Sequence, residues 1–513
     1  MKKIFFFLLV CCIFCTGQTI TILHTNDHHG HLESFRVAGQ HNVGGMAARM
    51  SLIESIRFEV AQKGGSILLL DCGDINTGEP VSDMLMGKPD VELMNLMGYQ
   101  AMALGNHEFD LTLENLLQQA SLANFPYLAT NVVYKETKKP IFPGSKIFEV
   151  QGIKIGVFAL SHPETGYIST HGKDERIEFI DPALVLPNII KELREKVDFI
   201  IALTHLDHGT IVELVKQFPG IDLVLAGHNH LFMMEPMQIG NSWLVEAGEY
   251  GISMGRWDIE FKDKKAVHMN YRLLGINLDK PLEESGKIVC MNMEEKFADH
   301  PVACKVLNKY LKETEKLLAE PLGEIKEDIY KNSKLEPFKS SPLGNLLCDA
   351  IKEQCNVDIV LQNMGGVRSD LLSGTATYKT VLTILPFTNS MYIYELTGKE
   401  ILGIFEHMAS GSVQPGGYLE IAGLYVRLKE NTVETIQYNN KPLEMDKKYR
   451  VAINSFMATG GDGYYMFPTY KGIDTGFILS SILKQHIVNH SPITANRELR
   501  IDWKDNKQEF KKE

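Results

Sequence analysis

Short apolar runs alternate with amphipathic segments along the first half of the chain. Six runs each lead into a cluster of polar residues: 19–24, 66–70, 101–104, 155–160, 199–203 and 221–226. Between them lie three segments with the apolar spacing of helices: 46–61, 113–123 and 182–195. Continuous apolar runs are typical of strands that are covered on both faces. We therefore predict an α/β domain of layered sheets flanked by helices.

The pattern changes after residues 301–319, which begin with Pro301 and repeat apolar residues with a helical period. Beyond it we expect a helix at 343–353 and three strand-like runs: 357–361, 381–385 and 451–454. A chain of 513 residues exceeds one core of ordinary size, so two domains are expected. The predicted segments are a signal peptide (1–17), a first domain (18–285), a linker with its helix (286–321), a second, α+β domain (322–505) and a charged tail (506–513).

The N-terminus has the composition of an export signal. Two lysines precede an apolar run, residues 4–14, that is too short to span a bilayer as a permanent helix. Small residues before Gln18 favour cleavage there, which would place the mature protein in the periplasm or at the cell surface. The alternatives are a buried N-terminal helix and a lipid anchor on Cys11, Cys12 or Cys15, the one route by which we expect a membrane partner.

The composition limits the classes of partner that the protein is expected to bind. A formal net charge of -12 argues against a duplex nucleic-acid partner, which would favour a basic face. An acidic protein that binds a phosphate must neutralise it locally, with metal ions or a few arginines. Three of the eight cysteines lie in the signal. Because the remaining five cannot all pair with one another in disulfides, at least one is expected to be a free thiol or to form a disulfide with another molecule. We expect them to be packing residues. Oligomeric state is left open.

Histidine, carboxylate and amide residues gather where the predicted strands end. Eight of the 17 histidines lie at four such exits: His28, His29, His31, His107, His205, His208, His228 and His230. They are interleaved with Asp27, Asp74 and Asn106. For any one histidine a simple hydrogen-bonded role is the alternative, and we prefer that alternative for His28, His31 and His208. The set as a whole indicates metal binding.

The donor atoms of this set restrict the metal. Carboxylate oxygen, amide oxygen and neutral imidazole suit manganese, zinc, iron or cobalt rather than calcium, and the lack of cysteine argues against a structural zinc site. Seven ligands are too many for one ion but suit two divalent ions that share a carboxylate. Two ions about 3.5–4 Å apart can bind a phosphoryl group, activate a water and stabilise the leaving oxygen.

The order of these residues resembles the calcineurin-like metallophosphoesterases. The motifs Thr25-Asn26-Asp27-His28-His29-Gly30 and Gly105-Asn106-His107-Glu108-Phe109-Asp110 resemble more closely the secreted 5′-nucleotidase and UDP-sugar hydrolase family, over essentially the whole mature chain. By position, the resemblance implies one metal held by Asp27, His29, Asp74 and His230. It implies a second held by Asp74, Asn106, His205 and His228, with Asp74 bridging. Relatives carry glutamine at the position of His230, which leaves metal preference open.

The resemblance also implies a catalytic pair. His107 would contact the phosphate and stabilise developing charge, and Asp110, three residues later, would orient its imidazole. A helix N-cap is the alternative role for Asp110, and the two roles are compatible.

The second half is similar to the family's nucleoside-binding domain, and the helix at 301–319 to the connector about which that domain swings. By position, Asn363 and Arg368 would contact phosphate or ribose, Phe387 and Phe456 would stack on the base, and Asn389 and Asp462 would bond to base edge and ribose. One departure concerns an arginine that relatives carry before the helix at 343–353. A proline falls there in this chain, and Lys339 is only a partial replacement.

These observations favour an exported enzyme that hydrolyses nucleoside 5′-monophosphates with two divalent ions. The same site would suit UDP-sugars, or 2′,3′-cyclic nucleotides with subsequent 3′-nucleotidase action. A non-catalytic surface protein that binds nucleotides is the alternative from another class. The ligand set argues against it, because every candidate position holds a residue that can bind metal.

Overall fold

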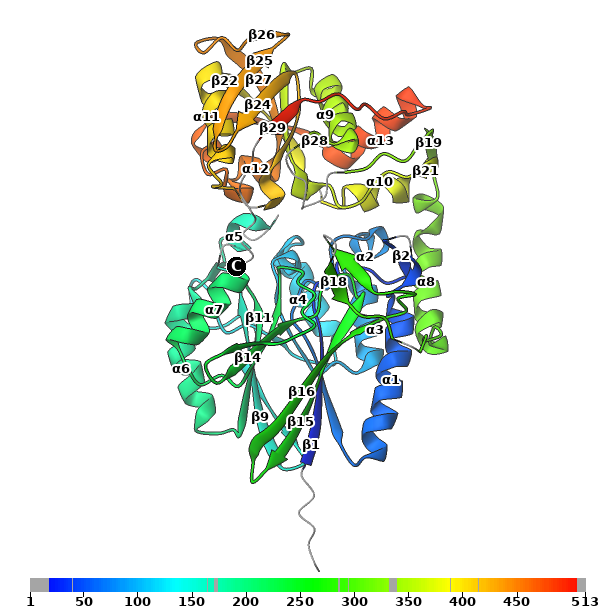
Figure 1. Cartoon of the computed structure of the whole chain (residues 1–513), viewed down its shortest axis with the longest axis vertical. Helices are drawn as coiled ribbons and strands as arrows, with labels where there is room; N and C mark the ends of the chain where they lie inside the picture. Colours follow the sequence, from blue (N-terminus) through cyan, green and yellow to red (C-terminus); the bar gives the residue numbers. More distant parts are fainter. Residues whose placement is uncertain are drawn as a thin grey trace, which may run out of the picture.

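The computed structural model describes residues 18–38, 40–163, 165–169, 174–284, 287–293, 295–331, 339–387, 389–413 and 415–504. The predicted signal peptide (1–17) and tail (506–513) lie outside these ranges. Figure 1 shows a lower body built from the first half of the chain, an upper body built from the second half, and one long helix beside both. Among the described residues, no helix has the length and apolar character needed to span a bilayer.

Two six-stranded sheets form the centre of the lower body. The first, in spatial order, contains β16 (Lys265–Gly275), β15 (Ser253–Lys262), β1 (Gln18–Thr25), β4 (Ser66–Asp71), β5 (Ala101–Ala103) and β6 (Tyr127–Leu128). The second contains β13 (Met237–Ile239), β14 (Ser242–Glu246), β12 (Leu223–Gly227), β11 (Phe199–His205), β9 (Ile153–Ser161) and β8 (Ser145–Val150). Fully buried apolar residues of both sheets, such as Ile22 and Leu203, pack into one cluster between them.

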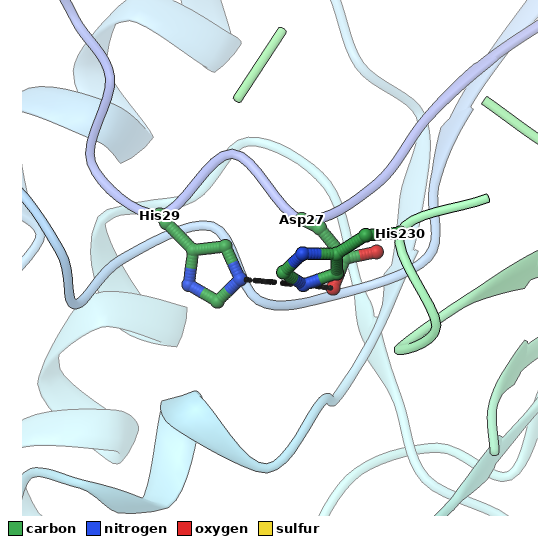
Figure 2. Close-up of side chains that lie close together, drawn as sticks. All are labelled: Asp27, His29 and His230. Atoms are coloured by element: carbon green, nitrogen blue, oxygen red, sulfur yellow. Dashed lines mark hydrogen bonds and ion pairs between the residues drawn. The ribbon is translucent and has the colours of Figure 1, made fainter. Parts of the chain in front are cut away.

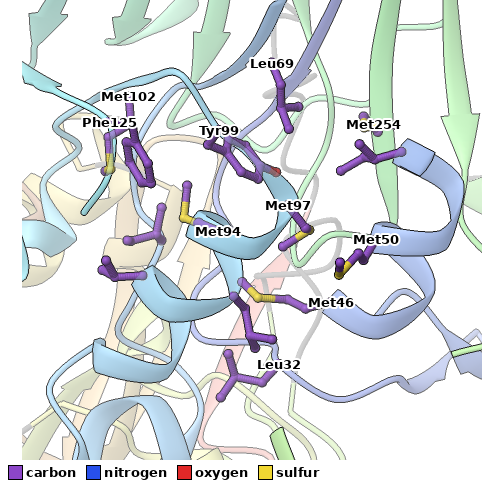
Figure 3. Packing of buried hydrophobic residues seen from close by; sticks show 14 of the residues in the cluster. Leu32, Met46, Met50, Leu69, Met94, Met97, Tyr99, Met102, Phe125 and Met254 are labelled. Carbon is purple, nitrogen blue, oxygen red and sulfur yellow. The ribbon is translucent and has the colours of Figure 1, made fainter. Parts of the chain in front are cut away.

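Helices cover the outer faces of the two sheets. The helices of this body are α1 (Met46–Gln62), α2 (Pro80–Met84), α3 (Lys88–Met97), α4 (Leu113–Leu122), α5 (Thr165–Ile168), α6 (Pro182–Arg194) and α7 (His208–Gln217). Against the first sheet, a methionine-rich layer includes Met46, Met50, Met94 and Met102 (Figure 3). Methionine side chains are flexible and fill irregular gaps, which suits the uneven surface between helices and sheet.

Parallel pairing brings the strand ends together. β1 pairs in parallel with β4 and β4 with β5, while β11 pairs in parallel with β9 and β12. Polar residues that follow these strands therefore emerge at the carboxyl edges of the two sheets, as in other α/β folds that bind ligands there. The remaining lower strands form three small ribbons: β2 (Phe35–Val37) with β3 (Gln40–Val43), β7 (Val132–Tyr134) with β10 (Ile177–Phe179), and β17 (Leu282–Glu284) with β18 (Lys287–Cys290).

The helix α8 (Pro301–Leu318) runs beside both bodies (Figure 1). It packs against α1, α2 and α3 below and against α10 (Tyr378–Ile384) above, so it is not confined to one domain. Buried Leu307 and Tyr310 belong to the methionine-rich cluster, and Leu382 of α10 packs on the same cluster. The chain then enters β19 (Pro321–Ile325), which pairs with β21 (Gly374–Thr377). The predicted segment boundaries stay predictions.

The upper body contains two further sheets. A five-stranded sheet has the order β23 (Leu419–Ala422), β20 (Ile359–Asn363), β27 (Lys448–Asn454), β22 (Ser390–Thr397) and β28 (Gly472–Ile478). A four-stranded sheet has the order β26 (Lys441–Pro442), β25 (Thr432–Tyr438), β24 (Leu424–Lys429) and β29 (Ile501–Lys504). Besides α10, the upper body contains the helices α9 (Pro342–Cys355), α11 (Gly398–Ala409), α12 (Ser455–Ala458) and α13 (Leu479–His490).

The predicted α/β fold class is confirmed, with one element wrong. The strand-like run 381–385 lies almost entirely in α10. Its β-branched residues favour a strand, but Thr377 and Thr380 form a capping box that starts a helix at Tyr378. Burial of Val381 and Ile384 supplies the apolar face that stabilises this helix in place. The other predicted helices and strands are present, with ends shifted by a few residues.

Candidate metal centre and substrate site

Three of the predicted ligands form a compact group at the sheet edges. Asp27 Oδ1 lies 3.3 Å from His230 Nε2 and 3.8 Å from His29 Nε2, and the two imidazole nitrogens are 3.1 Å apart. Figure 2 shows the His29 ring and the Asp27 carboxylate on one loop and the His230 ring on another, with the three groups close together. The three donor atoms lie within 4.8 Å of one another, which is the arrangement that one ion requires.

A second group adjoins the first through Asp74. Asp74 Oδ2 lies 3.0 Å from His205 Nε2 and 4.0 Å from His29 Nε2, so this carboxylate faces both groups. His228 Nδ1 lies 3.0 Å from Asn106 Oδ1, and its ring is 5.2 Å from that of His205. The structure therefore brings all seven predicted ligands into one region, with Asp74 in the middle.

The backbone at these positions is unusual. Five of the seven predicted ligands have a positive φ angle: Asp27 (52°), His29 (49°), Asp74 (56°), His228 (92°) and His230 (60°). Residues other than glycine seldom adopt this conformation, and where they do so in clusters the strain marks a functional site.

Hydrogen bonds orient the imidazoles for binding an ion. His29 Nδ1 lies 3.0 Å from the carbonyl oxygen of Thr77, and His205 Nδ1 lies 2.8 Å from that of Cys72. A carbonyl accepts only from a protonated nitrogen, so Nδ1 is the donor in each ring and Nε2 is the nitrogen available to an ion. His205 Nε2 is buried and lies 3.0 Å from Asp74 Oδ2, the carboxylate that faces both groups. The ring of His230 is fixed in the same way by the Glu249 carboxylate at Nδ1.

The charges of the cluster also suit cations. Burial would raise the pKa of Asp27, but His230 and His205 outweigh it and hold that pKa below its usual range. Burial opposes a charged His205, yet Asp74 raises its pKa to about 10. Burial lowers the pKa of His29 well below its usual value, and burial and His205 lower that of His228 to about 3. Without an ion, His205 is therefore protonated, and a divalent ion beside Asp74 would replace that proton. With the anionic carboxylates and the neutral imidazoles of His29 and His228, these residues form the donor set that divalent ions prefer, so they fit the ions.

Glu108 has a supporting role that spacing did not reveal. Its carboxylate accepts hydrogen bonds from the backbone N–H groups of Asp74 (2.9 Å), Ile75 (2.9 Å) and Gly105 (2.6 Å). Burial, followed by the charge of Asp74, raises the pKa of Glu108 to about 8. One side chain thus ties together the turns after β4 and β5. The only sequence signal was its place beside Asn106 and His107.

Asn26 has a similar role beneath Asp27. It donates to Asp27 Oδ2 (2.6 Å) and to the carbonyl of Gly248 (2.6 Å), and its Oδ1 accepts from Ala247 N–H (3.0 Å). The first ligand turn is thereby joined to the loop after β14.

His107 and Asp110 form the predicted pair. His107 Nδ1 lies 2.5 Å from Asp110 Oδ2, and its Nε2 lies 4.0 Å from Asp74 Oδ2, so the ring points towards the cluster. Burial would lower the pKa of His107, but Asp110 and Asp74 outweigh it and raise the pKa. The N-cap of α4 is Thr112, whose side chain accepts from Asn115 N–H, so the alternative cap role for Asp110 is wrong.

The three histidines that we set aside lie outside the ligand group. His28 is fully buried between Arg49, whose Nη1 lies 2.8 Å from its Nε2, and Asp71, at 3.3 Å. His31 stacks on Tyr250 with ring centroids 4.3 Å apart. His208 starts α7 and is buried. Sequence spacing missed His162, which forms a further group with Asp207 and His228.

Two predicted substrate residues of the upper body contact the lower one. Phe387 stacks on His107, with ring centroids 5.6 Å apart. The guanidinium of Arg368 lies 5.8 Å from the Phe387 ring centroid and 3.4 Å from the Tyr250 hydroxyl. A cavity of about 70 Å³ opens beside this contact, between Asp110 and Phe387. Both residues are thus within the region of the predicted phosphate.

The other four predicted substrate residues lie on neighbouring turns of the upper body. Asn363 donates to Asp462 Oδ2 (2.7 Å), and Asn389 Oδ1 accepts from the Ser455 hydroxyl (3.2 Å). The ring of Phe456, next to Ser455, lies on Gly461. The roles of these residues in binding a nucleotide stay predictions. Lys339 is exposed, and its backbone forms an isolated antiparallel β-bridge with Asp502, while residues 332–338 lie outside the described ranges.

Comparisons with known proteins agree with this architecture. Residues 20–232 match the calcineurin-like phosphoesterase family, and residues 321–469 match the 5′-nucleotidase C-terminal domain. The chain is 33% identical to a 5′-nucleotidase of Vibrio parahaemolyticus, over 94% of this chain and 91% of that protein. It is 35% identical to Protein UshA of Yersinia enterocolitica, over 93% and 92%.

Among solved structures, the chain is similar to a 5′-nucleotidase precursor from Thermus thermophilus, with a TM-score of 0.82 and 27% identity over 94% of this chain and 99% of that one. The first matched domain corresponds to the lower body of the structure and the second to the upper body. The chain therefore belongs to the 5′-nucleotidase family of metal-dependent phosphoesterases, in which a calcineurin-like phosphoesterase domain precedes a 5′-nucleotidase C-terminal domain.

Proposed function

We propose that this protein hydrolyses nucleoside 5′-monophosphates with two divalent ions, outside the cytoplasm. The observation that carries the proposal is the meeting of two sets of residues. The seven predicted metal ligands, Asp74 among them, lie in one region, and Arg368 and Phe387 of the other domain reach the same region. The relatives named 5′-nucleotidase support the substrate class, and the export signal in residues 1–17 supports the location.

The proposed division of ligands between two ions follows the family resemblance, and the proximity of the seven side chains supports it. Asp27, His29, Asp74 and His230 would hold one ion, and Asp74, Asn106, His205 and His228 the other. Bound there, divalent ions would supply Lewis-acid stabilisation of the phosphate charge and an activated water. This also answers how a protein with a net charge of -12 binds an anion. Manganese, zinc, iron and cobalt all suit the donor set.

The chain's own residues would stabilise the reacting phosphate. Asp110 holds the Nδ1 proton of His107, so Nε2 is the nitrogen that faces the substrate. With its pKa raised, His107 donates a proton or a charged hydrogen bond to a phosphate oxygen as negative charge develops. The forked donors of Arg368 would bind further phosphate or ribose oxygens. No covalent intermediate on the enzyme is needed.

The upper body would bind the nucleoside. Phe387 and Phe456 offer aromatic faces to a base, and stacking is worth about 1–3 kcal/mol per base with little dependence on its identity. Asp462 and Asn363, already bonded to each other, would bind ribose hydroxyls, and Asn389 the base edge. In this proposal the lower body carries out the reaction at phosphorus, and the upper body recognises the nucleoside.

A substrate panel tests the proposal. The mature protein, first stripped with chelator and then loaded with manganese, is given AMP, a UDP-sugar and a 2′,3′-cyclic nucleotide, and phosphate and nucleoside are quantified. We expect phosphate release from AMP that chelator abolishes. Faster turnover of the UDP-sugar or the cyclic nucleotide would reassign the substrate, while inactivity towards all three with metals bound would support a binding protein instead.

A further inference from the structure

A second group of candidate metal ligands lies in the upper body, away from the phosphate site. It consists of Glu353 near the end of α9 and of His486 and His490 in the last turns of α13. His486 Nδ1 lies 3.1 Å from Glu353 Oε2, and His490 Nε2 lies 3.0 Å from both carboxylate oxygens. The three ligand atoms lie within 4.8 Å of one another.

The fold holds these three side chains in position. His486 and His490 are four residues apart on one helix, so their rings share a face, with centroids 4.3 Å apart and planes 33° apart. Between them, Ile487 is fully buried in the cluster that also contains Leu347 and Ile351 of α9. Tight packing of the two helices therefore sets the distance from the imidazoles to the carboxylate. Figure 1 shows α9 and α13 adjacent in the upper body.

The contacts among the three side chains suit a cation. Two histidines compete here for one carboxylate that is 55% exposed, an arrangement that contributes little as an ion pair in water. One divalent ion would satisfy all three donor atoms together.

From this geometry we infer that Glu353, His486 and His490 bind a zinc ion. Two imidazoles and one carboxylate are a common zinc donor set, and a pair of histidines four apart on a helix is a recurring way to present it. His486 is 14% and His490 46% exposed, which leaves the outer coordination position to water. The inference is independent of the proposed phosphohydrolase activity, because none of these residues lies in the phosphate site.

The position of the site indicates a structural effect. α13 packs on β19, the strand that follows α8, and Lys484 of α13 lies 2.8 Å from Glu320 at the end of the α8 connection. Ile493, just after α13, exchanges backbone hydrogen bonds with Glu324 and Lys326 of this segment. A zinc ion across α9 and α13 would therefore brace the part of the upper body to which the connecting helix is attached.

Zinc stoichiometry on the full chain tests the inference. Chelator-stripped parent, His490→Gln and Glu353→Gln proteins are dialysed against micromolar zinc and analysed for bound metal, with His268→Gln, an exposed histidine on β16, as the matched control. We expect the parent and the control to hold one zinc equivalent more than either variant. Zinc should also raise the Tm of the parent more than that of the variants.

Two further measurements make the result decisive. Circular dichroism and Tm of the stripped proteins show that each variant folds like the parent, and phosphate release from AMP after manganese loading should be unchanged in all of them. Equal zinc content in the parent and both variants overturns the inference, as does an extra equivalent that appears in the parent only at millimolar zinc. Loss of phosphate release in every protein, parent included, would contradict the proposed function and leave this comparison intact.

Discussion

The imidazole of His107 lies nearly parallel to the ring of Phe387, with centroids 5.6 Å apart and planes 21° apart. The contact joins the proposed catalytic histidine of one domain to a proposed base-stacking residue of the other. Arg368 lies on the same aromatic ring, 5.8 Å from its centroid. Recognition of the base and reaction at phosphorus are therefore adjacent, and the two functions can be separated by experiment.

Replacement of Phe387 should weaken binding of the nucleoside. Loss of one stacking face, worth about 1–3 kcal/mol, predicts that Phe387→Ala raises KM for AMP about 5- to 150-fold. Ribose 5-phosphate, which has no base, should be hydrolysed with little change in kcat/KM. Phe477→Ala, an exposed phenylalanine on β28, is the matched control. An equal loss with both substrates would contradict the stacking role.

Replacement of His107 should slow the reaction and leave the ions in place. Positioned acid–base groups contribute about 10²–10⁴-fold, so His107→Ala should lower kcat for AMP by that factor. Asp110→Asn should cost less, because the imidazole remains. Metal analysis is essential here, since His107 lies near His29 and Asp74 and could itself be a ligand. Loss of a metal equivalent in His107→Ala would make it a ligand, and an unchanged rate would exclude it from catalysis.

Asp74 should be the residue on which both ions depend. Asp74→Asn keeps the size of the side chain and the acceptor for His107 N–H, at 2.7 Å, but removes the negative charge shared by the two groups. We expect loss of at least one metal equivalent and activity close to that of the chelated parent. The measurement is metal content by mass spectrometry beside phosphate release. A variant that retains two equivalents with full activity would show that Asp74 does not bridge.

The buried Asp462 should make substrate binding depend on pH. Burial raises the pKa of Asp462 to about 6, and the hydrogen bond from Asn363 opposes this only in part. The carboxylate is ionised above that pH and accepts hydrogen bonds from ribose hydroxyls, while below it the group is protonated and accepts them less well. KM for AMP should therefore rise as pH falls through about 6.

The control for this prediction must remove the ionisation of the substrate, whose phosphate titrates with a pKa near 6 as well. The ratio of KM between parent and Asp462→Asn cancels that contribution. The ratio should approach a constant below pH 6 and change above it. A ratio that is flat from pH 5 to pH 8 would show that Asp462 does not titrate in contact with the substrate.

Arg49 should stabilise the fold beneath the ligand turns. It is fully buried, and its Nη1 lies 2.8 Å from His28 Nε2, which in turn lies 3.3 Å from Asp71 Oδ2. Arg49→Met leaves a buried carboxylate without its nearby positive charge, and such losses cost about 3–5 kcal/mol. The free energy of unfolding, from urea titration, should fall by that amount. Arg272→Met, which breaks an exposed pair with Asp258, should cost about 0–1 kcal/mol; equal losses would contradict the role of Arg49.

Much of the fold was predictable because buried faces of helices and strands require apolar residues at regular spacings in the sequence. The helix at Met46–Gln62 and the strands at Ser66–Asp71 and Phe199–His205 follow the apolar periodicity directly. The segment Tyr378–Ile384 was not predictable in this way, because its β-branched residues favour a strand and only its cap and its tertiary packing select the helix.

The ligand positions were predictable for a topological reason. Side chains after parallel strands must meet at one edge of a sheet, so Asp27, Asp74 and Asn106 converge whatever lies between them. The partners that hold them were not predictable, because they act through backbone atoms or over long sequence distances. Glu108 accepts three backbone hydrogen bonds. Glu249 contacts His230 although strands β13 and β14 separate the two residues in the sequence.

The left-handed turns at Asp27, His29, Asp74, His228 and His230 have a consequence for how the enzyme acquires its ions. Such turns persist only where the surrounding structure holds them, here the paired strands and the hydrogen bonds of Glu108 and Asn26. We therefore expect the pocket to take its shape when the chain folds rather than when the ions bind. A pocket shaped in this way predicts that ions exchange without rearrangement of the chain. We therefore expect the bound metal to depend on which of the suitable ions the surroundings provide.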